Sequence, residues 1–300
     1  MSQQVHSARR LGRSLLLSGA VWTLAGCGGG QLSPAGPVSD AERTLFFDSL
    51  VIMLAIVIPV IIATIGFAWW YRSSNRRARR APDFVYSGRV ELVTWSIPTL
   101  VIVFLGGIAW ISSHDLDPAR PLQSKAQPVT VEVVSLDWKW LFIYPAQGVA
   151  SVNRLVVPTG VPLHLLLTSA TVWNAFWVPQ LGSMIYCMHG MVTTLNLEAS
   201  RPGIYYGESA MISGNGFAGM HFDTDAFSSQ AFSSWVDSSR SAGPTLDARS
   251  YLGLLEPTAS VTPFAYRSVQ PGFFRRIVLQ QLPAGRESGG AVSPQASGEL

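Results

Sequence analysis

The stretch from Ser209 to Met220 has the residue spacing of a metal-binding loop. Ser209 and Ser213 stand four residues apart, Phe217 follows after another four, and Met220 ends the series. Cysteine at the two serine positions and histidine at the phenylalanine position would supply the thiolate and imidazole donors that copper selects. Hydroxyl groups and a benzyl ring supply neither. The loop therefore has the spacing of a copper site, and Met220 is the one soft donor among these four residues.

The run "YCMHGM" contains a second group of side chains that could bind a metal. Alternation along a β-strand would place Cys187, His189 and Met191 on one face, so a copper site is possible there. The alternative, which we favour, is that these side chains pack as ordinary residues of the domain. His164, inside "VPLHLLL", is predicted to be a hydrogen-bonded histidine of the core or of a strand edge. The sequence shows no Ser/His/Asp triad, Walker loop or glycine-rich dinucleotide turn, so we expect no catalytic apparatus in this chain.

The composition indicates a membrane protein. Of the 300 residues, 48% are hydrophobic and 13% are charged, whereas about a quarter of an ordinary soluble chain is charged. Three of the 21 basic residues (Arg9, Arg10 and Arg13) lie in a leader, which leaves 18 basic against 18 acidic residues. A chain with this balance has no basic face for nucleic acid, and we exclude nucleic-acid binding.

The N-terminus has the pattern of a secretory signal. A charged start is followed by the apolar run Ser14–Ala25 and by "LAGC", which ends at Cys27. This motif resembles a bacterial lipobox, whose cysteine is lipidated and becomes the new N-terminus. A plain signal anchor with an incidental cysteine is the alternative. With Cys27 lipidated, Cys187 is the remaining thiol, and no internal disulfide can form.

Two uncharged apolar segments predict a transmembrane hairpin. Ser49–Tyr71 has 23 residues, and a helix of that length spans roughly 35 Å, enough to cross a bilayer; Leu92–Ser113 is of similar length. Six arginines lie between Arg72 and Arg89, so the connection is predicted to be cytoplasmic. Both chain ends then face outward, on the side where a lipobox cysteine is acylated.

After Ala119 the pattern changes to short apolar runs separated by turn residues, and several runs alternate with a period of two. This pattern predicts an antiparallel β-sandwich or barrel over residues 120–225. The runs are "VTVEVVS", "WKWLFIY", "NRLVVP", "VPLHLLLTS", "MVTTLNLEA" and "GIYYGES". Helical spacing follows from Ala226, and the Gly/Ser/Ala/Pro-rich tail beyond Leu282 is predicted to be disordered.

Four local motifs, in this order and on this topology, resemble subunit II of haem-copper respiratory oxidases. They are "DWKWLFIYP", "FWVPQLGS", "PGIYYGES" and "SGNGFAGMHF". The resemblance implies a membrane α+β protein in which a two-helix hairpin precedes a periplasmic cupredoxin-like domain with C-terminal helices. The implied organisation is a signal peptide (1–26), periplasmic linker (27–44), transmembrane helix (45–71), cytoplasmic loop (72–91), second transmembrane helix (92–113), cupredoxin-like domain (120–225), helical extension (226–282) and disordered tail (283–300).

In the cytochrome c oxidase branch of this family, the domain holds a binuclear copper centre. The resemblance places its two histidines at Asn174 and Phe217 and its two cysteines at Ser209 and Ser213. Its methionine falls at Met220, and the residue that supplies a backbone carbonyl falls at Met211. Without thiolates the site cannot bridge two copper ions. The pattern is similar to that of the quinol-oxidising branch, which includes bo-type ubiquinol oxidases. It implies a chain without a cofactor of its own, no docking of cytochrome c, and haem, copper and quinol in a partner, subunit I.

The resemblance also implies roles for lipids and protons. The chain would lie in the bacterial inner membrane, contact lipids and other oxidase subunits, and support assembly and stability of subunit I. Glu91 stands where the family has a glutamate implicated in the entrance of a proton path, although Tyr86 replaces a common histidine nearby. The alternative for Glu91 is a favourable carboxylate at a helix start. Rival functions are a copper-containing cytochrome c oxidase subunit and a free-standing, membrane-tethered binding lipoprotein.

Overall fold

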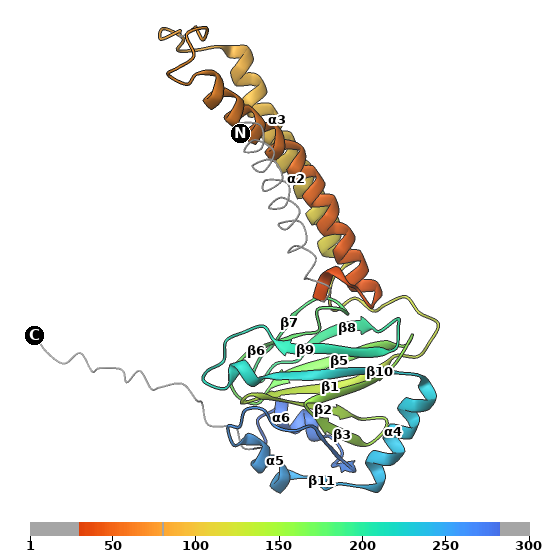
Figure 1. Cartoon of the computed structure of the whole chain (residues 1–300). Coiled ribbons are helices and arrows are strands. Elements are labelled where there is room, and N and C mark those ends of the chain that lie inside the picture. The colour runs from red at the N-terminus through yellow and green to blue at the C-terminus, as the bar shows by residue number, and fades with distance from the viewer. Residues whose placement is uncertain (1–29, 80, 283–300) are drawn as a thin grey trace, which may run out of the picture. The chain divides into compact units, whose positions relative to one another are not determined.

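The computed structural model describes residues 30–79 and 81–282 (Figure 1). The predicted signal peptide, Cys27 and the predicted disordered tail lie outside the described residues. The chain divides into two compact units. Among the described residues, a helical unit lies within 41–117, and a β-rich unit combines residues 30–40 with 118–282. Each unit is described by itself below.

The helical unit contains two long apolar helices, as predicted. Helix α2 (Pro37–Trp70) and helix α3 (Gly88–Asp115) have 34 and 28 residues, and their most apolar windows reach mean hydropathies of 2.9 and 2.0. Both are long and apolar enough to cross a membrane. Helix α2 continues through Pro59, and the Thr64 hydroxyl donates to the carbonyl of Val60, so this polar group is satisfied within the helix.

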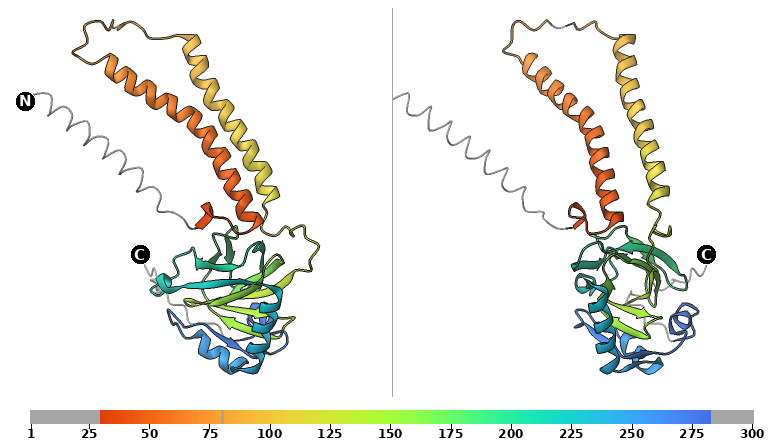
Figure 2. Two further views of the ribbon diagram at one scale, coloured as in Figure 1. Left: turned by 45° about the vertical axis from the view of Figure 1, so that its right-hand side comes forward. Right: turned by 90° about the vertical axis from the view of Figure 1, so that its right-hand side faces the viewer.

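The β-rich unit contains two main sheets (Figures 1 and 2). The first has the order β12-β3-β2-β1-β5-β8. Its strands are β1 (Val129–Leu136), β2 (Lys139–Tyr144), β3 (Val149–Val152), β5 (Pro162–Ser169), β8 (Thr193–Glu198) and β12 (Phe264–Tyr266). The second has the order β4-β10-β9-β6-β7. Its strands are β4 (Arg154–Pro158), β6 (Asn174–Trp177), β7 (Ile185–Cys187), β9 (Gly203–Ser209) and β10 (His221–Phe227).

All six apolar runs named above form strands, and most neighbouring strands are antiparallel. The pairs β1–β5 and β4–β10 are parallel, which the spacing of the runs did not indicate. The two sheets enclose a core of aromatic rings. Phe176 stacks on Phe222 at 5.1 Å, and Trp140 meets Phe176 edge-on at 5.4 Å. Gly207 gives Phe222 its space, because a Cβ there would lie 2.2 Å from that ring.

The segment after residue 226 is only partly helical, so the prediction of a helical extension was incomplete. It contains α4 (Ser229–Ser241), α5 (Ala248–Leu255) and α6 (Phe273–Val278), together with the short pair β11 (Thr245–Leu246) and β13 (Ser268–Val269). Strand β12 joins β3 at the edge of the first sheet. Tyr251 and Phe273 pack with Leu141 and Ile143 in a second hydrophobic cluster. The extension therefore completes the unit and buries a second face of its sheet.

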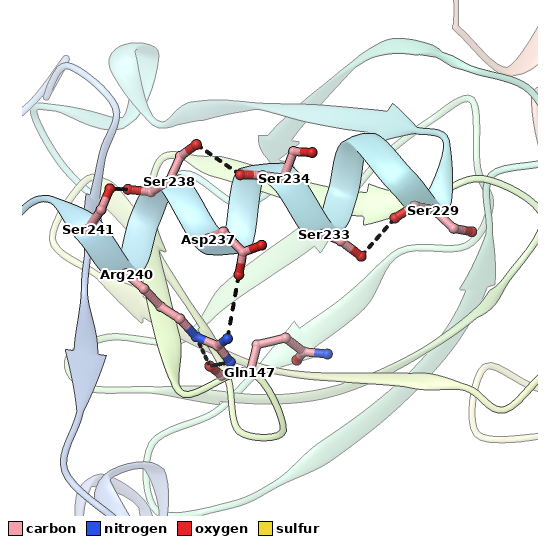
Figure 3. Close-up of polar contacts among 8 residues, drawn as sticks. All are labelled: Gln147, Ser229, Ser233, Ser234, Asp237, Ser238, Arg240 and Ser241. Atoms are coloured by element: carbon pink, nitrogen blue, oxygen red, sulfur yellow. Dashed lines mark hydrogen bonds and ion pairs between the residues drawn. The ribbon is translucent and has the colours of Figure 1, made fainter.

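Helix α4 is attached to the sheet by its apolar face and by Arg240. Phe232 and Val236 are buried, and the Trp235 ring lies 5.1 Å from that of Tyr144. The Arg240 guanidinium donates to the Gln147 carbonyl at 2.7 and 3.2 Å (Figure 3). Hydroxyl groups on the exposed face are satisfied by carbonyls three or four residues earlier in the helix; the donors are Ser233, Ser234, Ser238 and Ser241.

Residues 33–39, which precede the apolar part of α2, belong to the β-rich unit, and we call them the N-terminal clasp. The Ala35 amide donates to the Gln180 carbonyl at 2.7 Å, and the Ala35 carbonyl accepts from the Ser200 amide at 2.8 Å. Ala35 is 3% exposed. Gly36 lies so close to the end of β8 that a Cβ would be 2.1 Å from a backbone oxygen. Residues from both sides of the helical hairpin thus form one folded unit.

Candidate functional site

The candidate site lies where β6, β9 and the loop before β10 meet. Strand β9 ends at Ser209, and the loop that follows contains a short 3-10 helix, η3 (Phe217–Gly219), before β10 begins. Strand β6 starts at Asn174 and pairs antiparallel to β9, with Phe176 opposite Ser209. This pairing brings residues that are far apart in the sequence to the same end of the second sheet.

Three of the predicted positions are joined by hydrogen bonds. The Ser209 hydroxyl lies within bonding distance of two acceptors, Asn174 Oδ1 at 3.1 Å and the Met211 carbonyl at 3.2 Å. The Asn174 amide donates to the hydroxyl of Ser135 at 2.7 Å. Asn174 and Ser209 are 1% and 3% exposed. Amide and hydroxyl groups therefore satisfy one another at these positions.

Ser213 and Met220 approach each other on the other side of the loop. The Ser213 hydroxyl lies 3.9 Å from Met220 Sδ, and the Ser213 carbonyl accepts from Trp138 Nε1 at 3.2 Å. Met220 is 2% exposed and belongs to the core. Gly216 lies under the Trp138 ring, where a Cβ would be 2.2 Å from a ring atom. Phe217, at the second histidine position, is only partly buried.

These residues do not fit a copper centre. The site offers hydroxyl groups, an amide, a backbone carbonyl and one thioether, whereas copper sites in proteins use thiolate and imidazole donors. Within residues 30–79 and 81–282, no group of three or more His, Cys, Asp or Glu side chains is placed to hold a metal ion. The donor set of this loop therefore does not support electron transfer through a copper centre.

The second predicted group is not gathered on one face. Cys187 is buried in the core, and burial raises the pKa of its thiol. Strand β7 ends at this residue, so strand alternation does not continue to His189 and Met191. Met191 is 53% exposed, and His189 Nδ1 lies 3.1 Å from the Ser169 carbonyl. This arrangement favours packing over metal binding.

His164 makes the hydrogen bond that was predicted for it. Its Nδ1 lies 2.9 Å from Asn196 Oδ1, on the neighbouring strand β8. Glu91 lies in the first turn of α3, where its amide donates to the Ser87 carbonyl at 3.0 Å. Its carboxylate is exposed at this helix start, which agrees with both of the roles considered for it.

Two buried residues of opposite charge beside the site were missed at the sequence level. Asp137 and Lys139 flank Trp138 at the β1–β2 turn, and each is 2% exposed. The Lys139 ammonium donates to the carbonyls of Leu254 and Glu256, at 2.9 and 2.6 Å, at the end of α5. A charged residue in a turn normally lies in solvent, and the acceptors stand more than a hundred residues later. Nothing local in the sequence could have shown this burial.

The pKa values of the pair are shifted by this environment. Burial raises the pKa of the Asp137 carboxyl, and the positive charge of Lys139 partly opposes the shift. Burial lowers the pKa of the Lys139 ammonium, and the charges of Asp137 and Glu256 oppose that shift. The nearby Thr171 hydroxyl also lowers the pKa of Asp137, although it lies outside ideal hydrogen-bonding geometry to either carboxylate oxygen. Lys139 is therefore held by the two carbonyls that it contacts, and the charges of Asp137 and Lys139 favour each other without a direct ion pair.

Comparison with known proteins identifies the family. Residues 129–226 match the family described as cytochrome c oxidase subunit II, periplasmic domain. The chain is 45% identical over 276 residues to cytochrome bo(3) ubiquinol oxidase subunit 2 of Pseudomonas aeruginosa, covering 92% of this chain and 83% of that protein. It is 44% identical over 279 residues to ubiquinol oxidase subunit 2 of Acetobacter aceti, covering 92% and 89%. The chain therefore belongs to the ubiquinol oxidase subunit 2 family, with two apolar helices and a cupredoxin-like domain.

Proposed function

We propose that this chain is subunit 2 of a proton-pumping quinol oxidase, which couples quinol oxidation to the reduction of oxygen to water in a bacterial respiratory chain. The observation that carries the proposal is the hydrogen-bonded set Asn174, Ser209 and Met211, at positions that the family resemblance assigns to copper ligands in cytochrome c oxidases. A chain that cannot hold copper there cannot pass electrons from cytochrome c. We infer that it binds no cofactor and that haem, copper and quinol belong to subunit I.

We propose that the subunit acts through assembly and stability of its partners. A tagged full-length chain is expected to co-purify with a haem-bearing partner that has many helices, and the haem absorption spectrum of the eluate tests this. A free-standing binding lipoprotein would elute alone. A copper-containing subunit would carry two copper ions per chain and the purple absorption of a mixed-valence centre. Either result would replace the present proposal.

The proposed topology is a two-pass protein of the inner membrane with the β-rich unit in the periplasm. The arginine-rich connection favours a cytoplasmic loop. The N-terminal clasp supports the same topology independently, because residues before α2 and after α3 fold together and must lie on one side of the membrane. Cys27 would then be outside, where lipidation occurs. Mass spectrometry of the N-terminal peptide, compared with a Cys27→Ala chain, tests for the added lipid.

We further propose that Glu91 helps protons to enter subunit I. Its exposed carboxylate at the start of α3 supports this role, and so does the family resemblance. Oxygen consumption by Glu91→Ala is expected to fall while haem content and subunit yield stay normal, and Glu91→Asp is expected to restore part of the rate. Full activity in a normally assembled Glu91→Ala oxidase would remove this residue from any proton path.

A further inference from the structure

The connection between the two apolar helices carries a cluster of arginines that form no ion pair among the described residues. Arg72, Arg76, Arg77 and Arg79 follow α2 directly, and the first acidic residue after them is Asp83. All four arginine side chains are exposed. No carboxylate among the described residues forms an ion pair with them. Four guanidinium groups are therefore available to an anionic ligand at one end of a helix.

The turn after α2 is built in a way that holds these arginines at the helix end. The Asn75 side chain donates to the Trp70 carbonyl at 2.6 Å, which satisfies one of the last carbonyls of the helix. The same side chain accepts from the Arg77 amide at 3.1 Å. The Arg72 guanidinium lies over the Trp69 ring, 4.8 Å from its centroid. Two of the four cations are thus placed by specific contacts.

An apolar notch lies at the same end of α2. It has a volume of about 390 Å³ and is lined by Ala63, Gly66, Phe67, Trp70 and Tyr71. The small residues open the notch and the aromatic residues form its walls. Tryptophan and tyrosine prefer the boundary between hydrocarbon and headgroups. An apolar surface next to a cationic one suits an amphiphile whose head is negative.

The remainder of the connection exposes apolar side chains. Phe84, Val85 and Tyr86 are 66%, 92% and 71% exposed. Three consecutive apolar side chains in water are unfavourable, and together with the preceding arginines they match the composition of segments that lie at a membrane surface. This second feature of the connection points to the same environment as the notch.

We propose that the end of α2 and residues 72–79 form a binding site for an anionic phospholipid. Arg72, Arg76 and Arg77 contact the headgroup phosphate, for which the guanidinium fork is suited, and an acyl chain follows the notch on α2. A zwitterionic phospholipid has no net charge and gains less from these cations. The inference rests on the proposed function only for the two-pass topology.

The test uses the full chain in nanodiscs that contain equal amounts of phosphatidylglycerol and phosphatidylcholine. Native mass spectrometry of the protein released from them measures the ratio of the two lipids that stay bound. We expect phosphatidylglycerol to be enriched at low salt and the enrichment to fall as salt screens the charges. The triple variant Arg72→Gln/Arg76→Gln/Arg77→Gln is expected to lose enrichment, by about fivefold for each arginine removed.

A matched control removes the same charge from the β-rich unit. Arg249, Arg267 and Arg275 are also exposed, and their joint replacement by glutamine is expected to leave the lipid ratio unchanged. Equal loss in both triple variants, or no preference in the wild-type chain, would overturn the proposal. So would burial of residues 72–79 by a co-purified protein with no phospholipid retained. Because the lipid ratio needs no oxidase activity, its failure would leave the oxidase assignment standing, and the reverse also holds.

Discussion

Replacing Lys139 by methionine should destabilise the β-rich unit strongly, although the side chain touches no predicted ligand position. The change removes two hydrogen bonds from an ammonium group, to Leu254 and Glu256, and leaves the Asp137 carboxyl buried without its counter-charge. Hydrogen bonds to a charged group contribute about 1.5–3 kcal/mol each, so the loss of two of them should cost about 3–5 kcal/mol. In a unit of this size each kcal/mol lowers the melting temperature by about 2–4 °C, so we expect a decrease of roughly 6–20 °C.

The loss should depend on pH because Asp137 can take up a proton. Its pKa is already raised by burial, and removing the Lys139 charge raises it further. A carboxyl whose pKa is higher in the folded state stabilises the fold when protonated, and this contribution is lost as pH rises above the ordinary value. The decrease in melting temperature should therefore be smaller at pH 5 than at pH 8.

The assay is thermal unfolding of the full chain in detergent, followed by near-ultraviolet circular dichroism. Lys125→Met is the control, because Lys125 is exposed and is the other lysine of the chain. The double variant Asp137→Asn/Lys139→Met should recover part of the stability, since it removes the uncompensated carboxylate. If Lys139→Met melted within about 3 °C of the Lys125→Met control, which corresponds to roughly 1 kcal/mol, the hydrogen bonds from Lys139 to the end of α5 would not stabilise the unit as reasoned here.

Three further predictions concern packing and charge elsewhere in the β-rich unit. Gly216→Ala would push a Cβ to 2.2 Å from the Trp138 ring and should cost about 1–3 kcal/mol in urea denaturation, whereas Gly253→Ala, in helix α5 with open space around it, should be neutral or stabilising. Burial raises the pKa of Glu132 to about 7, so the stability of the fold should fall as pH rises from 4.5 towards 7. After discounting for partial exposure, we expect this loss to reach about 1 kcal/mol at pH 8. Glu132→Gln should flatten the pH dependence of the melting temperature, and an unchanged pH profile in this variant would contradict the prediction. Gly36→Val should detach the N-terminal clasp, because its Cβ would lie 2.1 Å from a backbone oxygen of β8, and limited proteolysis should then cut residues 33–39 faster than in the wild-type chain.

The long elements could be predicted from sequence because their signals are local. The apolar run from Ser49 locates α2, and the alternating runs locate six strands. The start of α2 at Pro37 could not be read from hydropathy, since its first turns are polar and join the β-rich unit. Strand β10, "HFDTDAF", was missed because its polar residues alternate with few apolar ones. Strand β12, with three residues, depends on its partner β3.

The candidate site, like the fold, could be predicted from the sequence only in part. Motif spacing and family resemblance brought Asn174 and Ser209 together, and the structure joins them by a hydrogen bond. The resemblance could not show what packs against Gly216, because that side chain, Trp138, comes from a distant turn. The contacts of Lys139 depend on α5, far along the chain, so only the tertiary structure could reveal them.

The N-terminal clasp has a consequence for how the protein is made. A soluble fragment that started at Pro118 would lack Ala35, a residue of its own hydrophobic core, and would leave the Ser200 amide and the Gln180 carbonyl without their partners. With the proposed topology, the β-rich unit can therefore reach its final structure only after the peptide ahead of the first helix has crossed the membrane. Biogenesis of this protein is thus expected to end with the joining of two chain segments that were exported at different times.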